Sequence, residues 1–368
     1  MCALGSKIDG QPILSIYLGC RKRAGLSRNK PSMDQKMIKK YFAAALLGAL
    51  IFFLGFISDK LVVDKLSDKK YVKKCLVERE NSYIKPNDFS FINPLLDCGD
   101  VGNVSHQNIN IIKTKVVQFI DEQKANGNIT RMSVYFRDLN NGPWFGINEE
   151  EEFNPGSLLK VPKMIAVLKE ADDDHLILEK NILVKGATST FVQYFKPEVS
   201  LIFDQAYTID ELVRRMIIYS DNDAAAVLGQ LLGSNILYKS YEDLGISVPT
   251  DGGYLTSVRN YGSFFRILFN ASYLSNKYSE KSLRLLSEVT FDKALRVGVP
   301  QHVQVAHKFG ERTDGGKKQL HDCGIIYVPD KPYLLCVMTR GYSFDTLASI
   351  IAQVSRIVYE GVEEKKVE

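Results

Sequence analysis

The sequence lacks the short motifs with which proteins commonly bind metals and nucleotides. It contains no Cys-x-x-Cys, no His-Glu-x-x-His and no cysteine–histidine cluster with zinc spacing, and its five histidines are scattered. A phosphate-binding glycine loop and a Gly-x-Gly-x-x-Gly fingerprint are also absent. The sequence therefore argues against a zinc protease, a P-loop nucleotidase and a dinucleotide-dependent enzyme, and we expect neither a metal nor an organic cofactor.

A nucleophile elbow is missing as well. Serine hydrolases that use a histidine base often carry their serine in Gly-x-Ser-x-Gly, and this chain has no such pattern. His307 and His321 are accordingly interpreted as structural residues. If the protein has a nucleophilic serine, another group must act as its base.

The chain has little excess charge. Its 47 lysines and arginines against 43 acidic residues give a net charge of +4, and nine of the basic residues fall within residues 1–40. The basic residues do not alternate with aromatic ones on any predicted face, so nucleic acid is not an expected partner.

One apolar run is long enough to cross a membrane. Tyr41–Ser58 carries no charge, and at a rise of about 1.5 Å per residue a helix of this length just spans a bilayer. The basic Lys36, Lys39 and Lys40 precede it, which predicts a cytoplasmic N-terminus and an extracytoplasmic remainder at the cell membrane. A cleavable signal peptide and a buried core helix are the alternatives. An uncleaved single-pass anchor is favoured, because the run is long and no small-x-small pair clearly follows it.

The six cysteines form no metal-binding pattern. Cys75 and Cys98 can pair in an oxidising exterior, whereas Cys323 and Cys336 lie on successive predicted strands and are interpreted as buried apolar side chains.

Apolar periodicity predicts strands at both ends of a domain and helices between them. The expected strands are Arg131–Leu139, Trp144–Asn148, Val303–Gly310, Gly324–Pro329 and Tyr333–Arg340. The expected helices are Asn108–Asn126, Ser157–Glu170, Ile209–Ile218, Asp223–Leu232, Lys239–Leu244, Ser257–Ala271, Tyr278–Thr290 and Phe344–Glu360. This order favours an α+β fold in which both termini contribute to one sheet and a helical subdomain is inserted. The expected organisation is a cytoplasmic N-terminus, an anchor, a stalk, the main domain and a charged tail, at residues 1–40, 41–58, 59–107, 108–360 and 361–368.

A serine followed three residues later by a lysine occurs more than once in the chain. Ser27–Lys30 and Ser67–Lys70 have no catalytic context, but Ser157 follows the turn Asn-Pro-Gly and opens an apolar-periodic helix. At a helix N-terminus the helix dipole favours a developing alkoxide. Residues three apart share one helix face, so Lys160 is expected beside Ser157.

Two later motifs complete a constellation. Ser157-Leu-Leu-Lys160 is followed by Ser220-Asp221-Asn222 and then by Lys308-Phe309-Gly310. Together they resemble the penicillin-recognising serine hydrolases, which comprise class A β-lactamases and DD-peptidases. The resemblance covers roughly Asn108–Val358 and implies a five-stranded antiparallel sheet flanked by helices, with an all-helical subdomain.

The resemblance implies a catalytic role for four side chains. Ser157 is the expected nucleophile and Lys160 its base, with the amine of Lys160 held neutral by burial and by the nearby charge of Lys308. Ser220 is expected to relay a proton to the leaving nitrogen.

Three further residues are expected to bind the substrate. Asn222 holds its amide side chain and contacts Lys160. Gly310 lets the strand approach closely, and the backbone N–H of Glu311 completes an oxyanion hole with that of Ser157.

The sequence departs from the family at two points. Phe309 stands where a serine or threonine normally binds the substrate carboxylate, and His307 or Arg312 is left to supply that contact. The only glutamate between Asp223 and Thr256 is Glu242, which lies in a predicted helix rather than in a loop suited to activate water. Slow deacylation is therefore expected.

These observations predict a membrane-anchored, extracytoplasmic serine hydrolase acylated at Ser157 by a β-lactam or a D-Ala-D-Ala-type amide of a peptidoglycan stem peptide. A DD-carboxypeptidase or cell-wall amidase is the alternative among enzymes. A non-catalytic wall-binding or sensor domain with the same fold is the alternative outside them.

Overall fold

The computed structural model describes residues 89–94, 106–140, 142–186, 192–246 and 254–364. The expected anchor at Tyr41–Ser58, the Ser-x-x-Lys patterns at Ser27 and Ser67, and the Cys75–Cys98 pair lie outside these residues. Within the described ranges, no helix combines the length and the apolar character needed to cross a bilayer.

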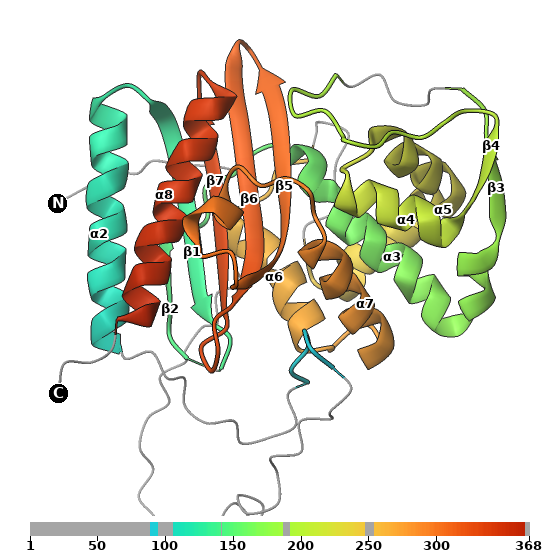
Figure 1. The fold of residues 1–368 in the computed structure, drawn as a ribbon, viewed down its shortest axis with the longest axis horizontal. Helices are drawn as coiled ribbons and strands as arrows, with labels where there is room; N and C mark the ends of the chain where they lie inside the picture. Colours follow the sequence, from blue (N-terminus) through green and yellow to red (C-terminus); the bar gives the residue numbers. More distant parts are fainter. Residues whose placement is uncertain (1–88, 95–105, 141, 187–191, 247–253, 365–368) are drawn as a thin grey trace, which may run out of the picture. The chain divides into compact units, whose positions relative to one another are not determined.

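The described strands form a five-stranded antiparallel sheet in the order β2-β1-β7-β6-β5 and a separate pair, β3-β4 (Figure 1). The first two strands of the chain form a hairpin, and the last three continue the sheet beside β1. The expected sheet built from both ends of the domain is confirmed. The strands of the large sheet are β1 Ile129–Asp138, β2 Trp144–Ile147, β5 Gln304–Asp314, β6 Lys317–Tyr327 and β7 Tyr333–Gly341.

The β5–β6 hairpin is longer than the sequence predicted. The expected strands ended at Gly310 and resumed at Gly324, but β5 and β6 pair continuously across a tight turn. Gly315 and Gly316 form that turn with φ angles of 54° and 77°, which suit glycine. Residues 313–317 are exposed, so they lack the apolar alternation that would reveal a strand.

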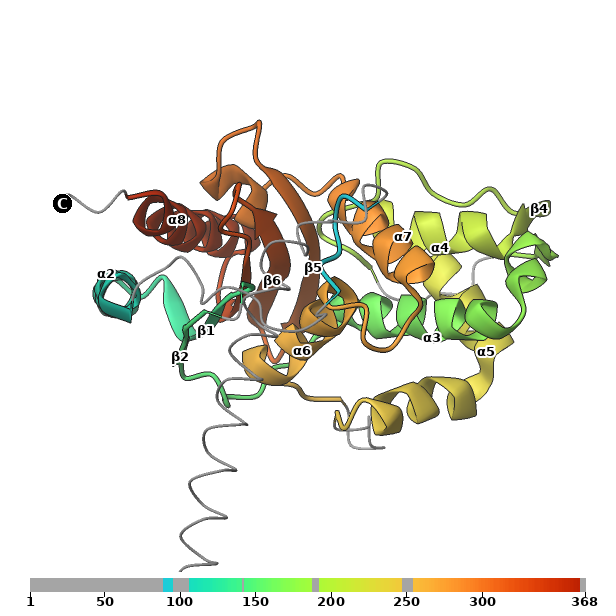
Figure 2. The ribbon, with the colours of Figure 1, turned by 90° about the horizontal axis from the view of Figure 1, so that it is seen from below.

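Two long helices cover one face of the sheet. Helices α2 (His106–Ala125) and α8 (Phe344–Glu363) lie side by side there, together with the short turn η3 (Leu295–Gly298) (Figures 1 and 2). Their apolar stripes bury a core with the sheet residues Val134, Leu335 and Val337. The helical periodicity of both segments predicted these two helices correctly.

The remaining helices lie on the other face and extend away from it (Figure 2). They share a second core, centred on Ile165, Met216 and Phe265. Helix α4 begins with the expected capping box, in which Thr208 Oγ1 accepts from the N–H of Glu211 at 3.1 Å while Glu211 Oε2 accepts from the N–H of Thr208 at 2.7 Å. The helices are α3 Lys160–Asp173, α4 Ile209–Ile218, α5 Asn222–Asp243, α6 Val258–Phe269 and α7 Asn276–Ser287.

Helix α5 bends at a glycine. Gly233 has φ 68° and ψ 163° inside the helix, so α5 consists of two helical segments. This agrees with the two helices expected on either side of Gly233. The short strands β3 (Asn181–Val184) and β4 (Gln205–Thr208), by contrast, lie in a stretch predicted as irregular. Each has only four residues, two of them exposed, which is too short to show a clear period.

Two sheet cysteines are joined in a disulfide. Cys323 on β6 faces Cys336 on β7 directly, with Cα atoms 4.0 Å apart. Both side chains are fully buried, as expected, but their interpretation as unbridged apolar side chains was wrong. The register of β6 against β7 makes them cross-strand neighbours, and the sequence alone does not fix that register.

Part of the segment expected as a stalk packs against the domain. The side chain of Glu280 on α7 is 4% exposed and accepts the backbone N–H groups of Ser90, Phe91 and Ile92 at 2.9 to 3.1 Å. The hydroxyl of Tyr327 also donates to the carbonyl of Phe91, at 3.1 Å. Residues 89–94 are therefore held on the domain by a buried carboxylate that accepts three of their N–H groups, together with the hydroxyl of Tyr327.

Replacing Glu280 with alanine is expected to lower the free energy of unfolding by about 3 kcal/mol, because buried backbone donors would lose their charged acceptor. Urea denaturation measures the loss. Glu288→Ala is the matched control, since Glu288 pairs with Arg214 at the surface and its removal should cost about 0.5 kcal/mol or less. Equal effects of the two substitutions would contradict the anchoring role of Glu280.

Candidate active site

Ser157 lies on a short 3-10 turn, Gly156–Leu159, that leads directly into α3. Gly156 has φ 54°, and its N–H donates to Asn154 Oδ1 at 3.1 Å. Leu158 is fully buried, and its carbonyl accepts the hydroxyl of Tyr261 at 2.9 Å. The turn is thus fixed on both sides of the serine, and the sequence prediction of a helix start at Ser157 is correct within one turn.

Strand β5 comes close to this turn. A side chain at Gly310 would run into the carbonyl of Pro155 and the amide nitrogen of Leu158, and one at Gly156 would meet the carbonyl of Glu311. Only glycine fits at either position. Because both positions are glycine, the edge of β5 can pass directly alongside Ser157, whose hydroxyl is the expected nucleophile.

The amine of Lys160 lies between the first two motifs. Its Nζ is 3.0 Å from Ser157 Oγ, 2.6 Å from the carbonyl oxygen of Ser220, 3.0 Å from Ser220 Oγ and 2.7 Å from Asn222 Oδ1. The lysine is only 4% exposed. One amine therefore contacts both the expected nucleophile and the expected proton relay.

Ser220 occupies the break between two helices. It has φ 56°, follows the end of α4 and precedes Asp221, which caps α5 by accepting the N–H groups of Asp223 and Ala224. This left-handed residue directs its hydroxyl and its carbonyl at Lys160. Asn222, the first residue of α5, is placed beside them by the same break.

Lys308 on β5 approaches Ser220 from the opposite side. Its Nζ donates to Ser220 Oγ at 2.9 Å and to the carbonyl of Phe309 at 3.1 Å, and its side chain is fully buried. Ser220 Oγ consequently lies between two lysine amines, which form a continuous hydrogen-bonded path with it.

Burial and mutual charge change the proton affinity of both amines. Burial lowers the pKa of Lys308 from its usual 10.5 to about 7, although the charges of Asp322 and Glu311 oppose this. Burial, and then the charge of Lys308, lowers the pKa of Lys160 well below 10.5. Both causes favour the neutral amine of Lys160, which suits its expected role as the base.

The hydrogen bonds of Lys160 also suit a neutral amine. A neutral amine has two N–H groups, and the two shortest contacts are to carbonyl oxygens that can only accept, those of Ser220 and Asn222. With both N–H groups engaged, the lone pair is left to accept a hydroxyl proton. Ser157 Oγ, at 3.0 Å, can donate it.

Glu311 presents two different groups to the site. The carbonyl of Phe309 accepts a hydrogen bond from Lys308, so it points to the free edge of β5 and away from β6. Backbone groups two residues apart along a strand point in the same direction, so the N–H of Glu311 faces that edge as well. Its carboxylate accepts the N–H of Phe195 at 3.2 Å. Burial raises the pKa of the Glu311 carboxyl group, whereas the backbone N–H groups of Phe195 and Tyr194 oppose the shift.

The structure brings all seven predicted site residues together. Side-chain hydrogen bonds join five of them: Ser157, Lys160, Ser220, Asn222 and Lys308. Gly310 and Glu311 contribute the edge of β5 alongside the turn of Ser157.

The two histidines near the third motif serve the fold. His307 is 2% exposed, and its Nδ1 lies 2.9 Å from Asp322, whose side chain is fully buried and also accepts the N–H of Leu295. Burial lowers the pKa of His321 to about 4, and its Nε2 lies 2.9 Å from the carbonyl of Asn154. His307 is thus engaged inside the sheet, which removes it as a substitute contact for a substrate carboxylate.

Sequence reasoning missed two contacts of the site. Gln193 donates through Nε2 to the carbonyl of Ser220 at 3.1 Å, and Tyr261 holds the carbonyl of Leu158. Gln193 belongs to a stretch without periodicity, so no local signal predicted it. Tyr261 is one of several aromatic residues on the apolar face of α6, and nothing in the sequence distinguishes it from the others.

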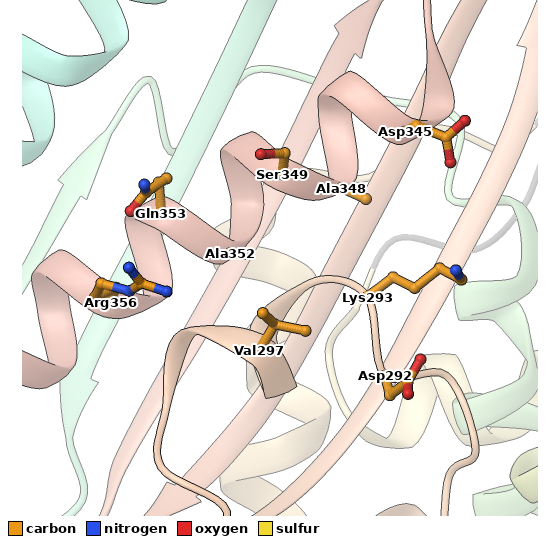
Figure 3. A pocket seen from close by; sticks show the side chains of 9 residues that line it. All are labelled: Asp292, Lys293, Val297, Asp345, Ala348, Ser349, Ala352, Gln353 and Arg356. Carbon is orange, nitrogen blue, oxygen red and sulfur yellow. The ribbon is translucent and has the colours of Figure 1, made fainter.

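A groove of about 450 Å³ lies elsewhere, between α8 and η3 (Figure 3). None of the seven site residues lines it. Charged side chains at its border include Lys293, Asp345 and Arg356. We assign the chemistry to the buried serine–lysine cluster, because the groove contains no comparable nucleophile and base.

A serine and a buried lysine held by two further motifs, on an α+β sheet with a helical subdomain, define a penicillin-recognising type of serine hydrolase. The model of the β-lactamase enzyme family matches residues 113–362, and the chain belongs to that family.

Individual relatives are distant. The β-lactamase of Bacillus amyloliquefaciens is 23% identical over 252 residues, which cover 63% of this chain and 80% of that protein. A β-lactamase structure from Chitinophaga pinensis has a TM-score of 0.61 and 22% identity, covering 69% of this chain and 100% of the other. PBP-A, solved as an acyl-enzyme with penicillin G, has a TM-score of 0.58 and 21% identity, covering 69% and 97%.

Proposed function

We propose that this protein is a membrane-anchored, extracytoplasmic serine hydrolase whose Ser157 is acylated by β-lactams or by D-Ala-D-Ala-type amides. The observation that carries the proposal is the position of Lys160 Nζ, 3.0 Å from both Ser157 Oγ and Ser220 Oγ. The relatives point the same way, since two are β-lactamases and one was solved as an acyl-enzyme with penicillin G.

Acylation follows from these distances. The proton of Ser157 passes to Lys160 as Oγ attacks the carbonyl carbon of the amide. The oxyanion faces the backbone N–H groups of Ser157 and Glu311. The C–N bond then breaks, and the proton reaches the leaving nitrogen from Lys160 through Ser220 Oγ, giving a serine ester and a free amine.

Hydrolysis of this ester requires a water and a base to activate it. Glu242, the only glutamate between Asp223 and Thr256, is exposed on the second segment of α5. This supports acylation followed by slow deacylation, because a missing general base costs about 10²–10⁴-fold in rate.

The membrane part of the proposal rests on sequence. Tyr41–Ser58 is apolar, and basic residues precede it, so the enzyme domain would follow the anchor on the outer side. Peptidoglycan stem peptides are accessible there, as are β-lactams.

The direct test uses the full chain in detergent with a fluorescent penicillin and a chromogenic cephalosporin. We expect a covalent adduct on Ser157, seen by intact mass and peptide mapping, that persists while little cephalosporin is hydrolysed. Deacylation should be about 10²–10⁴-fold slower than it would be with a general base in place to activate water. Ser157→Ala is the control that must lose the label.

The outcomes separate the candidate functions. A persistent adduct would confirm the proposed acylation of Ser157 and, among the enzymes, favour the second candidate, a DD-carboxypeptidase or cell-wall amidase, which the missing glutamate supports. Rapid hydrolysis of the cephalosporin would instead indicate a β-lactamase that turns over. The absence of any Ser157 adduct would contradict the proposal and favour a binding or sensor domain.

A further inference from the structure

The third motif carries an aromatic residue that is turned into the protein. Phe309 is 3% exposed, and its ring stacks on that of Phe291 with centroids 3.9 Å apart. Phe195 meets Phe309 edge to face at 6.2 Å and also packs on Phe344. Phe309 has no hydrogen-bonding side-chain group, so it offers no donor to an anionic substrate.

The same cluster holds a loop over the site. Residues 192–195 are attached at three points, through Gln193 to the carbonyl of Ser220, through the N–H of Phe195 to the Glu311 carboxylate, and through Tyr194 OH to Asp345 at 2.6 Å. The loop thereby fixes the carboxylate of Glu311 beside the second and third motifs.

The negative charge of the Glu311 carboxylate affects the pKa of both Lys160 and Lys308. It is among the groups that favour the protonated forms of Lys160 and Lys308, and they in turn favour its ionised form. Lys308, the nearest cation on this wall, is fully buried and already donates to Ser220 Oγ and to a carbonyl. With Lys160 acting as a neutral base and Lys308 already engaged, Glu311 places a carboxylate on this wall, where an incoming anion would meet it.

The leaving group of a substrate must lie along this wall. Its nitrogen has to reach Ser220 Oγ, while the carbonyl oxygen faces the N–H of Glu311. Substituents on the leaving nitrogen therefore fall between Ser220 and the edge of β5, close to the Glu311 carboxylate. A carboxylate on the leaving group would meet a like charge in a partly buried site, where screening is weak.

We propose that Glu311, together with the inward-turned Phe309, makes this site prefer acyl donors with a neutral leaving group, so that β-lactams and D-Ala-D-Ala-type amides, whose leaving groups carry a carboxylate, acylate Ser157 but more slowly than neutral counterparts. Donors with a neutral leaving group acylate Ser157 faster than matched donors with an anionic one. This inference rests on the proposed function, because it concerns the substrate of the same acylation reaction.

The test compares two thioesters with the same N-acyl-D-alanyl group, one bearing mercaptoacetate and the other mercaptoacetamide as the leaving thiol. They differ only in a carboxylate and a carboxamide. The full chain in detergent is mixed with each, and Ser157 acylation is followed by intact mass to give second-order rate constants. We expect the wild-type protein to prefer the carboxamide donor by about tenfold or more, and the preference to shrink at high salt.

Two variants locate the cause. Glu311→Gln should shift the ratio of the two rate constants by about fivefold or more toward the carboxylate donor. Tyr194→Phe loosens the same loop without changing the charge beside the site, so it should leave the ratio within about twofold of wild type. Because a ratio is measured, a general loss of activity in either variant cancels.

Each outcome decides a different question. Faster acylation of the wild-type protein by the carboxylate donor overturns the inference while leaving the proposed function intact, and would assign Arg312 as an anion contact. A ratio that is unchanged in Glu311→Gln, or that shifts equally in Tyr194→Phe, also overturns it. Failure of both donors to acylate Ser157 overturns the proposed function itself.

Discussion

Replacing Lys160 with alanine is expected to slow acylation of Ser157 by about 10²–10⁴-fold, because a serine hydroxyl is a poor nucleophile without a base in contact. Lys160 Nζ is the base within reach, at 3.0 Å from Ser157 Oγ. The same substitution removes the amine that links Ser157 to Ser220 and Asn222. The rate constant for labelling by fluorescent penicillin measures the effect, and circular dichroism checks that the fold is retained.

Two further variants distinguish lost chemistry from lost packing. Lys160→Met keeps most of the side-chain volume without the amine, and should be as inactive as the alanine variant. Lys163→Met alters a lysine one turn further along α3, which is also partly buried and donates to the carbonyl of Ala225 at 2.7 Å. It should label within about threefold of wild type, since Lys163 is not among the groups that contact Ser157. Persistent labelling of Lys160→Ala would mean that a different group activates the serine.

The sequence predicted the parts of this site that depend on local spacing. Ser157 and Lys160 share a helix face because they are three residues apart, and the structure places their polar atoms in hydrogen-bond contact. Ser220 was expected at a break between two helices, and the capping box of α4 fixed where the preceding helix begins. The spacing of the three motifs along the chain did not predict that they come together in space. It came from resemblance to a family, and the family match over residues 113–362 now supports it.

The parts that could not be predicted depend on register and on long-range contacts. The disulfide between Cys323 and Cys336 exists because β6 pairs with β7 in one register, which no local pattern specifies. The inward orientation of Phe309 depends on Phe291 and on Phe195, an aromatic in a stretch without periodicity. The anchoring of residues 89–94 depends equally on one carboxylate, Glu280, nearly 190 residues away in the chain.

Replacing Lys308 with methionine is expected to abolish efficient acylation and yet to stabilise the fold at neutral and acidic pH. Burial lowers the pKa of Lys308 from 10.5 to about 7, so holding its charged form inside the protein costs on the order of 5 kcal/mol. Methionine fills a similar volume without that cost. Part of the gain is offset because the hydrogen bond from Lys308 to Ser220 Oγ is lost.

The sign of the pH dependence follows from proton binding. Below pH 7 the amine is protonated in both states, and the folded protein bears the full cost. Between about pH 7 and 10.5 the unfolded chain binds the proton while the folded protein does not, so the wild-type free energy of unfolding rises with pH. The advantage of Lys308→Met is therefore largest below pH 7 and shrinks as the pH is raised through that interval.

Urea denaturation at several pH values between 5.5 and 9.5 measures this difference. Lys317→Met, at an exposed lysine on the turn of the same hairpin, is the matched control and should run parallel to wild type at every pH. Parallel curves for Lys308→Met and wild type would contradict a lowered pKa at Lys308.

The charge of Lys308 also explains why acylation is lost in this variant. It lowers the pKa of Lys160, so without Lys308 the amine of Lys160 keeps its proton up to a higher pH. A buried ammonium group that weakens the fold thus keeps the neighbouring amine available as a base.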